Sequence, residues 1–195
     1  SRLKPLDFTR FFEFRKRLKK VKQGGNVYMN NKVHLDIDGM GIVFFSAETM
    51  KDVIPDTDFL TSEFTSPQQI ANHIKKGDIT AFCTGSSGSF DIHFFKGYPS
   101  IDTLEKFPVS IRLALDVQGG SIQFCDLFWL SKWNTDFPQD QIIALPDGYY
   151  EMTVCTCLPE SGYWGDEQTI YIYFNMVDKM PELTWTGVPY LFTEE

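Results

Sequence analysis

Alternating apolar and polar positions dominate the C-terminal half of the chain and predict short β-strands. The clearest unit is the segment 142–158, in which a short apolar run leads into Pro146-Asp147-Gly148. Proline pre-sets φ, aspartate tolerates turn geometry and glycine supplies a positive φ, so this tripeptide predicts a tight turn. After it, Tyr150, Met152 and Val154 alternate with more polar residues, which is the period of a strand. The segment is therefore predicted to be a hairpin: strand, turn, strand.

The same pattern recurs between residues 107 and 177. Val109–Val117 alternates regularly, Gly119-Gly120 turns the chain, and Thr169–Met176 ends the series. Five or six short strands separated by turn residues favour an antiparallel sandwich. We expect residues 107–195 to form an antiparallel β-sandwich part.

Residues 1–98 predict a smaller α+β part. Val33–Phe45 predicts a hairpin around Gly39-Met40-Gly41, and Ile79–Cys83 with Phe90–Phe95 predicts another around a Gly/Ser loop. Between them, Ser66-Pro67-Gln68-Gln69 has the serine cap, first-turn proline and third-position glutamine of a helix start. Lys96–Phe107 predicts a linker, and the predicted fold class is α+β, mainly β.

A basic amphipathic helix is predicted over Phe8–Lys22. Its apolar residues recur at helical spacing, and lysines and arginines fill the opposite face. Such a helix either docks on the protein through its aromatic stripe or lies on an anionic membrane. We expect docking, because the rest of the chain is acidic and supplies the counter-charge.

The charge is divided unevenly along the chain. The net charge is −8, but residues 1–22 carry nine Lys or Arg against Asp7 and Glu13, so the other 173 residues carry −15. An acidic surface repels nucleic acid and attracts basic proteins, and it also keeps a protein in solution. The charge therefore leaves open a basic partner or solubility alone.

No pattern of residues predicts catalysis, a metal site or a cofactor. Asp36-x-Asp38-Gly39 lacks the remaining ligands of a calcium loop, and the loop Thr84–Ser89 lacks the lysine and following helix of a phosphate-binding loop. The four cysteines are too few and scattered for a disulfide framework, and no apolar run is long enough to cross a membrane. We expect a soluble, cytoplasmic protein with free thiols.

Two stretches resemble known bacterial families. Val109–Val117, Gly119-Gly120 and Leu145-Pro146-Asp147-Gly148-Tyr149-Tyr150 with the strand to Leu158-Pro159 resemble the competence-nuclease inhibitor type of small β-sandwich. Ile70–Phe94, with Gly77-Asp78-Ile79 and Thr84-Gly85-Ser86-Ser87-Gly88, is similar to domains among bacterial toxin-immunity proteins. Together the two stretches cover about half the chain.

The resemblance implies a non-enzymatic, immunity-type protein that binds and neutralises a cognate toxin or nuclease. An inhibitor of a basic nuclease needs acidic groups and aromatic anchors. The candidate partner-binding residues are Trp133, Asp136, Asp140, Tyr163, Trp164, Asp166 and Glu167.

Two other functions stay open. A β-sandwich module for carbohydrate or membrane would use exposed tryptophans or the basic helix. A hydrolase would use Asp91 or Glu151 with His93, although no nucleophile and base stand at a known spacing. The identity of the partner and the oligomeric state also stay open.

Overall fold

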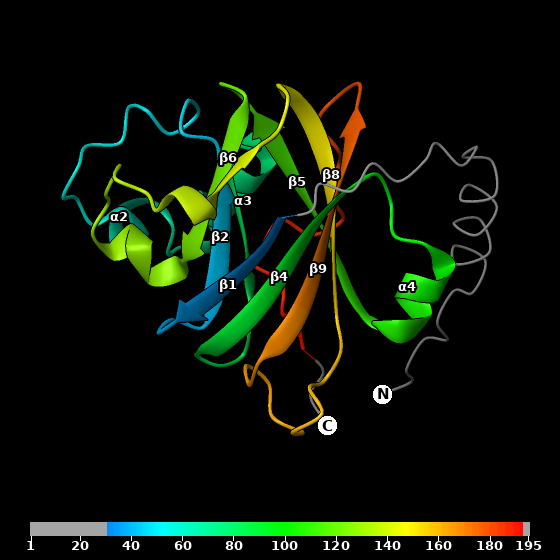
Figure 1. The fold of residues 1–195 in the computed structure, drawn as a ribbon. Coiled ribbons are helices and arrows are strands. Elements are labelled where there is room, and N and C mark those ends of the chain that lie inside the picture. The colour runs from blue at the N-terminus through cyan, green and yellow to red at the C-terminus, as the bar shows by residue number, and fades with distance from the viewer. Residues whose placement is uncertain (1–30, 193–195) are drawn as a thin grey trace, which may run out of the picture.

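The computed structural model describes residues 31–192, which form two β-sheets packed face to face (Figure 1). The five-stranded sheet has the order β1-β4-β9-β8-β5 and the four-stranded sheet the order β3-β2-β6-β7. All neighbouring strands are antiparallel except β4 and β9, which are parallel. The strands are β1 Asn31–Ile37, β2 Gly41–Phe45, β3 Ile79–Cys83, β4 Gly88–Lys96, β5 Val109–Val117, β6 Ser121–Asp126, β7 Ile142–Ala144, β8 Gly148–Thr156 and β9 Gln168–Val177.

The main core fills the space between the sheets. It is made of the inward-facing residues of both sheets, and Phe94 of β4 meets Phe124 of β6 across it with ring centroids 5.1 Å apart. Alternation on the strands produces this core, because every second side chain points to the same face. The predicted fold class, α+β and mainly β, is confirmed.

Helices cover the outer face of the four-stranded sheet and enclose a second core. This second core comprises Val43, Phe45, Met50, Phe59, Phe64, Ile79, Ala81, Cys125, Leu130, Trp133 and Phe137. The covering elements are α2 Phe59–Glu63, α3 Pro67–Lys76 and the 3₁₀ helices η1 Leu127–Ser131 and η2 Gln139–Gln141.

Helix α3 begins as predicted. The Ser66 hydroxyl accepts from the Gln69 amide, and the Gln69 side chain accepts from the Ser66 amide. This capping box satisfies two amides that lack partners inside the helix. Gly77 ends the helix in the left-handed conformation, as its place after Lys75-Lys76 predicts.

The predicted hairpins are wrong, because their strands do not pair with each other. β1 and β2, β3 and β4, β5 and β6, and β7 and β8 are each split between the two sheets. Each of these turns is an arch that carries the chain across the core. Turn residues and alternation are common to hairpins and arches, so the sequence pattern does not distinguish them.

Aspartate side chains from elsewhere in the chain hold two of the arches. The Asp126 carboxylate accepts the amides of Asp38 and Gly39, at 2.8 and 2.9 Å. The Asp147 carboxylate accepts the Gly120 amide at 2.7 Å, which ties the β7–β8 arch to the β5–β6 arch. Asp126 and Asp147 therefore serve as hydrogen-bond acceptors for backbone amides in these arches.

Both sheets draw strands from both predicted parts, 1–98 and 107–195. β1 and β4 complete the five-stranded sheet with β5, β8 and β9, while β6 and β7 complete the four-stranded sheet. The predicted linker contains helix α4 Ile101–Lys106, whose following residue Phe107 packs on Tyr171 with centroids 4.4 Å apart. The two parts thus share both sheets and the main core.

One prediction from the sequence concerns residues that the structure does not describe. The predicted amphipathic helix Phe8–Lys22 belongs to residues 1–30, which the structure does not describe. Within residues 31–192, no helix combines the length and apolar character needed to cross a bilayer.

The C-terminal segment is joined to the edge of β3. The Cys83 amide donates to Pro189 O and the Leu191 amide to Cys83 O, both at 2.8 Å. Leu191 is fully buried in the main core, whereas Tyr190 is 61% exposed. The segment covers the sheet edge, and Leu191 is its anchor.

Replacing Leu191 tests whether this segment is part of the folded core. We expect Leu191→Ala to lower the free energy of unfolding by about 2–5 kcal/mol, because a buried aliphatic side chain leaves a cavity. Its neighbour provides the control, since Tyr190→Ala removes an exposed ring and is expected to change stability by about 0.5 kcal/mol or less. Urea unfolding measures both, and equal effects would show that the segment is not anchored as described.

Candidate functional site

The loop Pro159–Glu167 between β8 and β9 projects from one end of the five-stranded sheet (Figure 1). Tyr163 is 74% exposed at its tip, Trp164 is half-buried, and Asp166 and Glu167 are exposed. The loop contains acidic residues and no lysine or arginine. Four of the predicted partner-binding residues therefore lie together on one projecting loop.

Hydrogen bonds fix the base of this loop to the β3–β4 arch. The Ser86 hydroxyl donates to Trp164 O and the Ser89 amide donates to Gly165 O, both at 2.8 Å. Below it, the Gly165 amide donates to the Gln168 side chain, whose own amide donates to the buried Thr156 hydroxyl. A loop held in this way presents its side chains with little ordering cost on binding.

Two glycines allow the loop and the arch to approach each other. A Cβ on Gly88 would lie 2.1 Å from Gly165 O, and one on Gly165 would lie 2.7 Å from Ser87 O. Gly165 also has a φ of +84°, which favours glycine. The Gly/Ser loop of residues 84–89 is therefore the surface on which the loop Pro159–Glu167 packs.

The C-terminal segment extends the aromatic surface beside Trp164. The ring centroid of Phe192 lies 6.5 Å from that of Trp164 and 5.0 Å from that of Tyr190. Tyr190 and Phe192 are not among the partner-binding residues predicted from the sequence. Their alternation at positions 190 and 192 is visible in the sequence, but only the pairing with β3 places them beside the loop.

Charged residues of β1 and β4 flank the other side of the loop. His34 Nδ1 lies 3.1 Å from Asp91, whose other oxygen lies 2.7 Å from Lys32 Nζ. The hydrogen bond with Asp91 raises the pKa of His34, and those from Lys32 and His34 lower the pKa of Asp91. Ligand atoms of His34, Asp91 and Glu167 lie within 4.8 Å of one another, so these three side chains are the group in the described region that a metal ion would fit.

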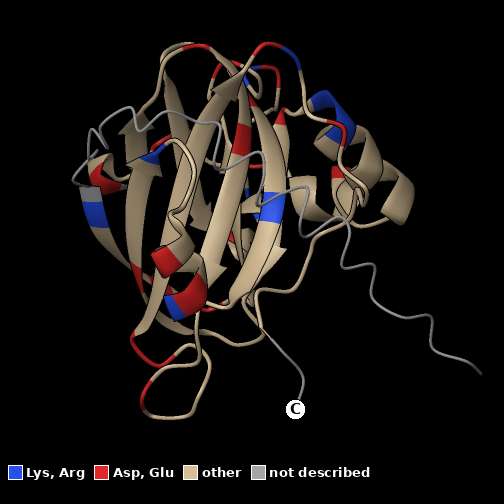
Figure 2. Cartoon of the chain, turned by 90° about the vertical axis from the view of Figure 1, so that its right-hand side faces the viewer, with Lys and Arg blue, Asp and Glu red and all other residues tan. Residues whose placement is uncertain are grey.

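We define the acidic–aromatic end by the exposed and half-buried groups of these elements: Tyr163, Trp164, Asp166, Glu167, Tyr190, Phe192, Asp36 and Asp91. The described residues contain nine Lys or Arg and 22 Asp or Glu. Figure 2 shows the excess of acidic positions, many of them in loops and at strand ends. This end combines aromatic side chains with carboxylates on a fixed backbone.

The other three predicted residues lie elsewhere. Trp133 is 2% exposed in the second core, 5.0 Å from Phe45 and 5.4 Å from Phe59 between ring centroids, so it offers no surface to a partner. Trp133 follows η1 and is part of the helical layer that covers the four-stranded sheet. Asp136 and Asp140 are exposed near η2, at the side of the molecule away from the loop Pro159–Glu167 (Figure 1).

The residues of the hydrolase alternative do not assemble into one site. The ring of His93 packs on Tyr171 with centroids 5.0 Å apart, and burial lowers the pKa of His93. Asp91 is held by Lys32 and His34, and the Glu151 carboxylate accepts from the Tyr98 hydroxyl at 2.5 Å. Each of the three groups is thus occupied in a separate contact.

A second arrangement of titratable groups lies at the C-terminal end of α3. The buried Asp78 carboxylate accepts from His73 Nδ1 at 2.9 Å and pairs with Lys76 Nζ at 2.8 Å. Burial opposes ionisation of Asp78, but the hydrogen bonds from His73 and Lys76 outweigh it and lower the pKa of Asp78. The sequence showed Asp78 only as the residue after the helix-ending Gly77.

Comparison with known proteins gives two structural neighbours. No family model matches the chain, and no curated protein sequence matches it. The crystal structure of ComJ, inhibitor of the DNA degrading activity of NucA, from Bacillus subtilis, is 15% identical, with a TM-score of 0.48 over 79% of this chain and 100% of that one. A structure described as crocagin biosynthetic gene J is 12% identical, with a TM-score of 0.49 over 73% of this chain and 95% of that one. Since both TM-scores are below 0.5, neither likeness assigns a family or a function to the chain.

Alanine substitution at two glycines tests the anchoring of the loop. Both Gly162 and Gly165 have positive φ, but only Gly165 has backbone atoms where a Cβ would lie. We expect Gly165→Ala to be about 1–3 kcal/mol more destabilising than Gly162→Ala, because it adds overpacking to the same conformational strain. Chemical unfolding of the two variants measures this difference, and equal losses would contradict the close contact.

The pH dependence of stability tests the role of Asp78. A carboxyl group whose pKa is lowered by folding stabilises the folded state above its unfolded pKa, near 3.8, and this contribution disappears as pH falls through the folded pKa. We expect Asp78→Asn to cost about 1–3 kcal/mol at pH 7 and less at pH 3. The exposed Asp56, 3.4 Å from Lys132, provides the control, and Asp56→Asn is expected to have little effect. A loss for Asp78→Asn that is the same at both pH values would contradict the ionised pair.

Proposed function

We propose that this protein is a non-enzymatic, immunity-type inhibitor that binds a basic cognate toxin or nuclease through its acidic–aromatic end. The observation that carries the proposal is the fixed loop Pro159–Glu167, which brings the exposed Tyr163, Asp166 and Glu167 together with the half-buried Trp164. Binding energy at protein interfaces concentrates in a few aromatic or charged anchors on ordered backbone.

The charge of the chain supports a basic partner. An acidic surface speeds the encounter with a basic protein and competes with the phosphates of nucleic acid for the same basic groups. Inhibition would then follow from occupying the partner's substrate-binding surface. This role requires neither a cofactor nor a catalytic residue in the inhibitor.

Calorimetric titration against the protein encoded by the neighbouring gene tests the proposal. We expect a tight complex whose affinity falls as salt rises, because exposed charges are screened. Trp164→Ala is expected to weaken binding by about 2 kcal/mol or more, as for an interface anchor. Glu105→Gln on α4 serves as the control, since this exposed residue is not part of the acidic–aromatic end and is expected to leave affinity unchanged.

Further variants define the extent of the surface. Asp166→Asn with Glu167→Gln is expected to slow association and to reduce its salt dependence, because steering depends on these charges. Asp136→Asn and Asp140→Asn decide whether the second acidic segment belongs to the interface. A complex that forms equally well with all these variants would exclude the acidic–aromatic end as the binding surface.

One observation favours the carbohydrate-binding alternative. Trp185 is 58% exposed and lines a cavity of about 350 Å³ with Arg112 and Glu151. An exposed indole beside hydrogen-bonding side chains suits stacking on a sugar ring. Glycan binding that is lost in Trp185→Ala and kept in Trp164→Ala would favour this alternative.

A further inference from the structure

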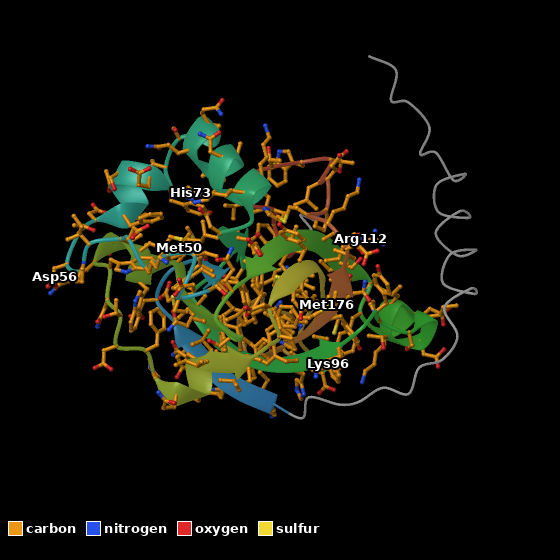
Figure 3. All side chains as sticks on the ribbon, turned by 90° about the horizontal axis from the view of Figure 1, so that it is seen from above. Met50, Asp56, His73, Lys96, Arg112 and Met176 are labelled. Atoms are coloured by element: carbon orange, nitrogen blue, oxygen red, sulfur yellow. The ribbon has the colours of Figure 1, made fainter. Side chains whose placement is uncertain are left out.

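A cavity lies outside the acidic–aromatic end, against the outer helices. It has a volume of about 390 Å³ and lies between helices α2 and α3 and the segment 49–57. Met50 and His73, two of its lining residues, appear on the same side of the molecule in Figure 3, away from Arg112 and Met176. Mixed apolar and polar cavities of this size are typical of ligand sites.

One wall of the cavity carries a histidine in a fixed orientation. His73 Nδ1 faces the buried Asp78 carboxylate at 2.9 Å, and the His73 ring lies 5.4 Å from the ring of Phe59. When the neutral imidazole donates Nδ1–H to Asp78, its Nε2 is a hydrogen-bond acceptor. This wall therefore offers an acceptor together with aromatic faces.

Two carboxylates in the lining have no ion pair of their own. The carboxylates of Asp52 and Glu63 form no hydrogen bond and no ion pair within 4.0 Å with any of the residues 31–192, although Asp52 lies near enough to Lys51 and Lys76 to attract them. Lys76 is the lining cation, and its ammonium group pairs with Asp78 at 2.8 Å. With neutral His73, the lining carries a net charge of −2, which favours a cationic ligand.

The remaining lining combines the hydroxyl residues Thr49, Thr57 and Ser62 with apolar side chains. Met50 and Phe59 are buried at the cavity, and Ile54 is 69% exposed in the lining. A ligand for this cavity thus needs an alkyl portion to contact these side chains and a cationic head to meet the carboxylates. An arginine side chain has both, and its planar guanidinium also stacks on aromatic rings.

We propose that this cavity receives an arginine side chain of a protein partner. The guanidinium has five donors in a planar fork, enough for Asp52, Glu63 and His73 Nε2 at once, whereas a lysine ammonium offers three donors at one point. The identity of the partner as a toxin or nuclease rests on the proposed function. The chemistry of the cavity does not, so the two are tested separately.

An NMR titration with N-acetyl-arginine methylamide tests the cavity without any partner. We expect saturable shifts of the His73 ring and neighbouring amides, with a roughly millimolar dissociation constant that rises with salt. N-acetyl-citrulline methylamide is the matched ligand control, because a neutral urea replaces the guanidinium, and it is expected not to saturate. Equal binding of the citrulline analogue, or of N-acetyl-lysine methylamide, would overturn the assignment to arginine.

Substitutions identify the carboxylates that hold the ligand. The double variant Asp52→Asn with Glu63→Gln is expected to weaken arginine binding about tenfold or more, because it removes charge-assisted hydrogen bonds. Asp56→Asn is the matched control, since this exposed aspartate does not line the cavity, and it is expected to leave binding within about twofold. Equal weakening by the control would show a general charge effect and overturn the site.

The test of arginine binding to the cavity and the test of the proposed function can succeed or fail independently. Both carboxylates are exposed, so the double variant is expected to fold, and its unfolding midpoint confirms this. Arginine binding that is lost in the double variant and kept in Trp164→Ala supports the cavity whether or not an inhibitor complex exists. The absence of saturable arginine binding to the unaltered protein overturns the cavity proposal and leaves the acidic–aromatic end to its own test.

Discussion

The closed apolar layer between the two sheets is the constraint on which the rest of this structure depends. Each sheet has one face that must be removed from water, and Phe94 meets Phe124 across the layer at 5.1 Å. The chain crosses this layer at four arches, so β1 and β2, β3 and β4, β5 and β6, and β7 and β8 lie in opposite sheets. Several partners within each sheet are then distant in sequence, as with His34 opposite Asp91. Neither half of the chain contains a complete sheet.

This interleaving also explains where the molecule has free, ordered surface. The parallel pairing of β4 with β9 brings the arch before β4 next to the loop before β9. The approach of Gly88 to Gly165 and the buried bond between Gln168 and Thr156 then fix that loop. Aromatic and acidic side chains that would be mobile on a free loop thus acquire a defined arrangement. Ordered backbone of this kind is what a binding surface needs, because less conformational entropy is lost on association.

The excess of carboxylates is used in three different ways. Asp126 and Asp147 accept backbone amides at the arches and belong to the fold. Asp78 is buried and satisfied by His73 and Lys76. Asp52, Glu63 and Asp166 remain exposed without such partners, and they mark the two surfaces that we propose for binding. Net charge alone does not separate these roles, since they differ in burial and in hydrogen bonding.

The sequence by itself determined the local features of this protein. The strands from Val109 to Val177, the capped start of α3 at Ser66 and the mainly β fold class follow from alternation, turn residues and capping, which act within a few residues. The projecting character of Tyr163, Asp166 and Glu167 was also predictable, because the segment has turn residues and no strand period.

Only the tertiary structure decided how these elements pair. The turns at Gly39 and Gly120 permit a hairpin or an arch, and the choice depends on competition among all strands for the same core, which no local pattern records. Trp133 and Trp164 look alike in sequence, as aromatic residues beside acids, yet the helical cover buries the first and the loop holds the second at the surface. The cavity beside His73 likewise arises from three segments that meet only after folding. Burial and long-range pairing are collective properties of the chain, and for that reason they became visible only in the folded structure.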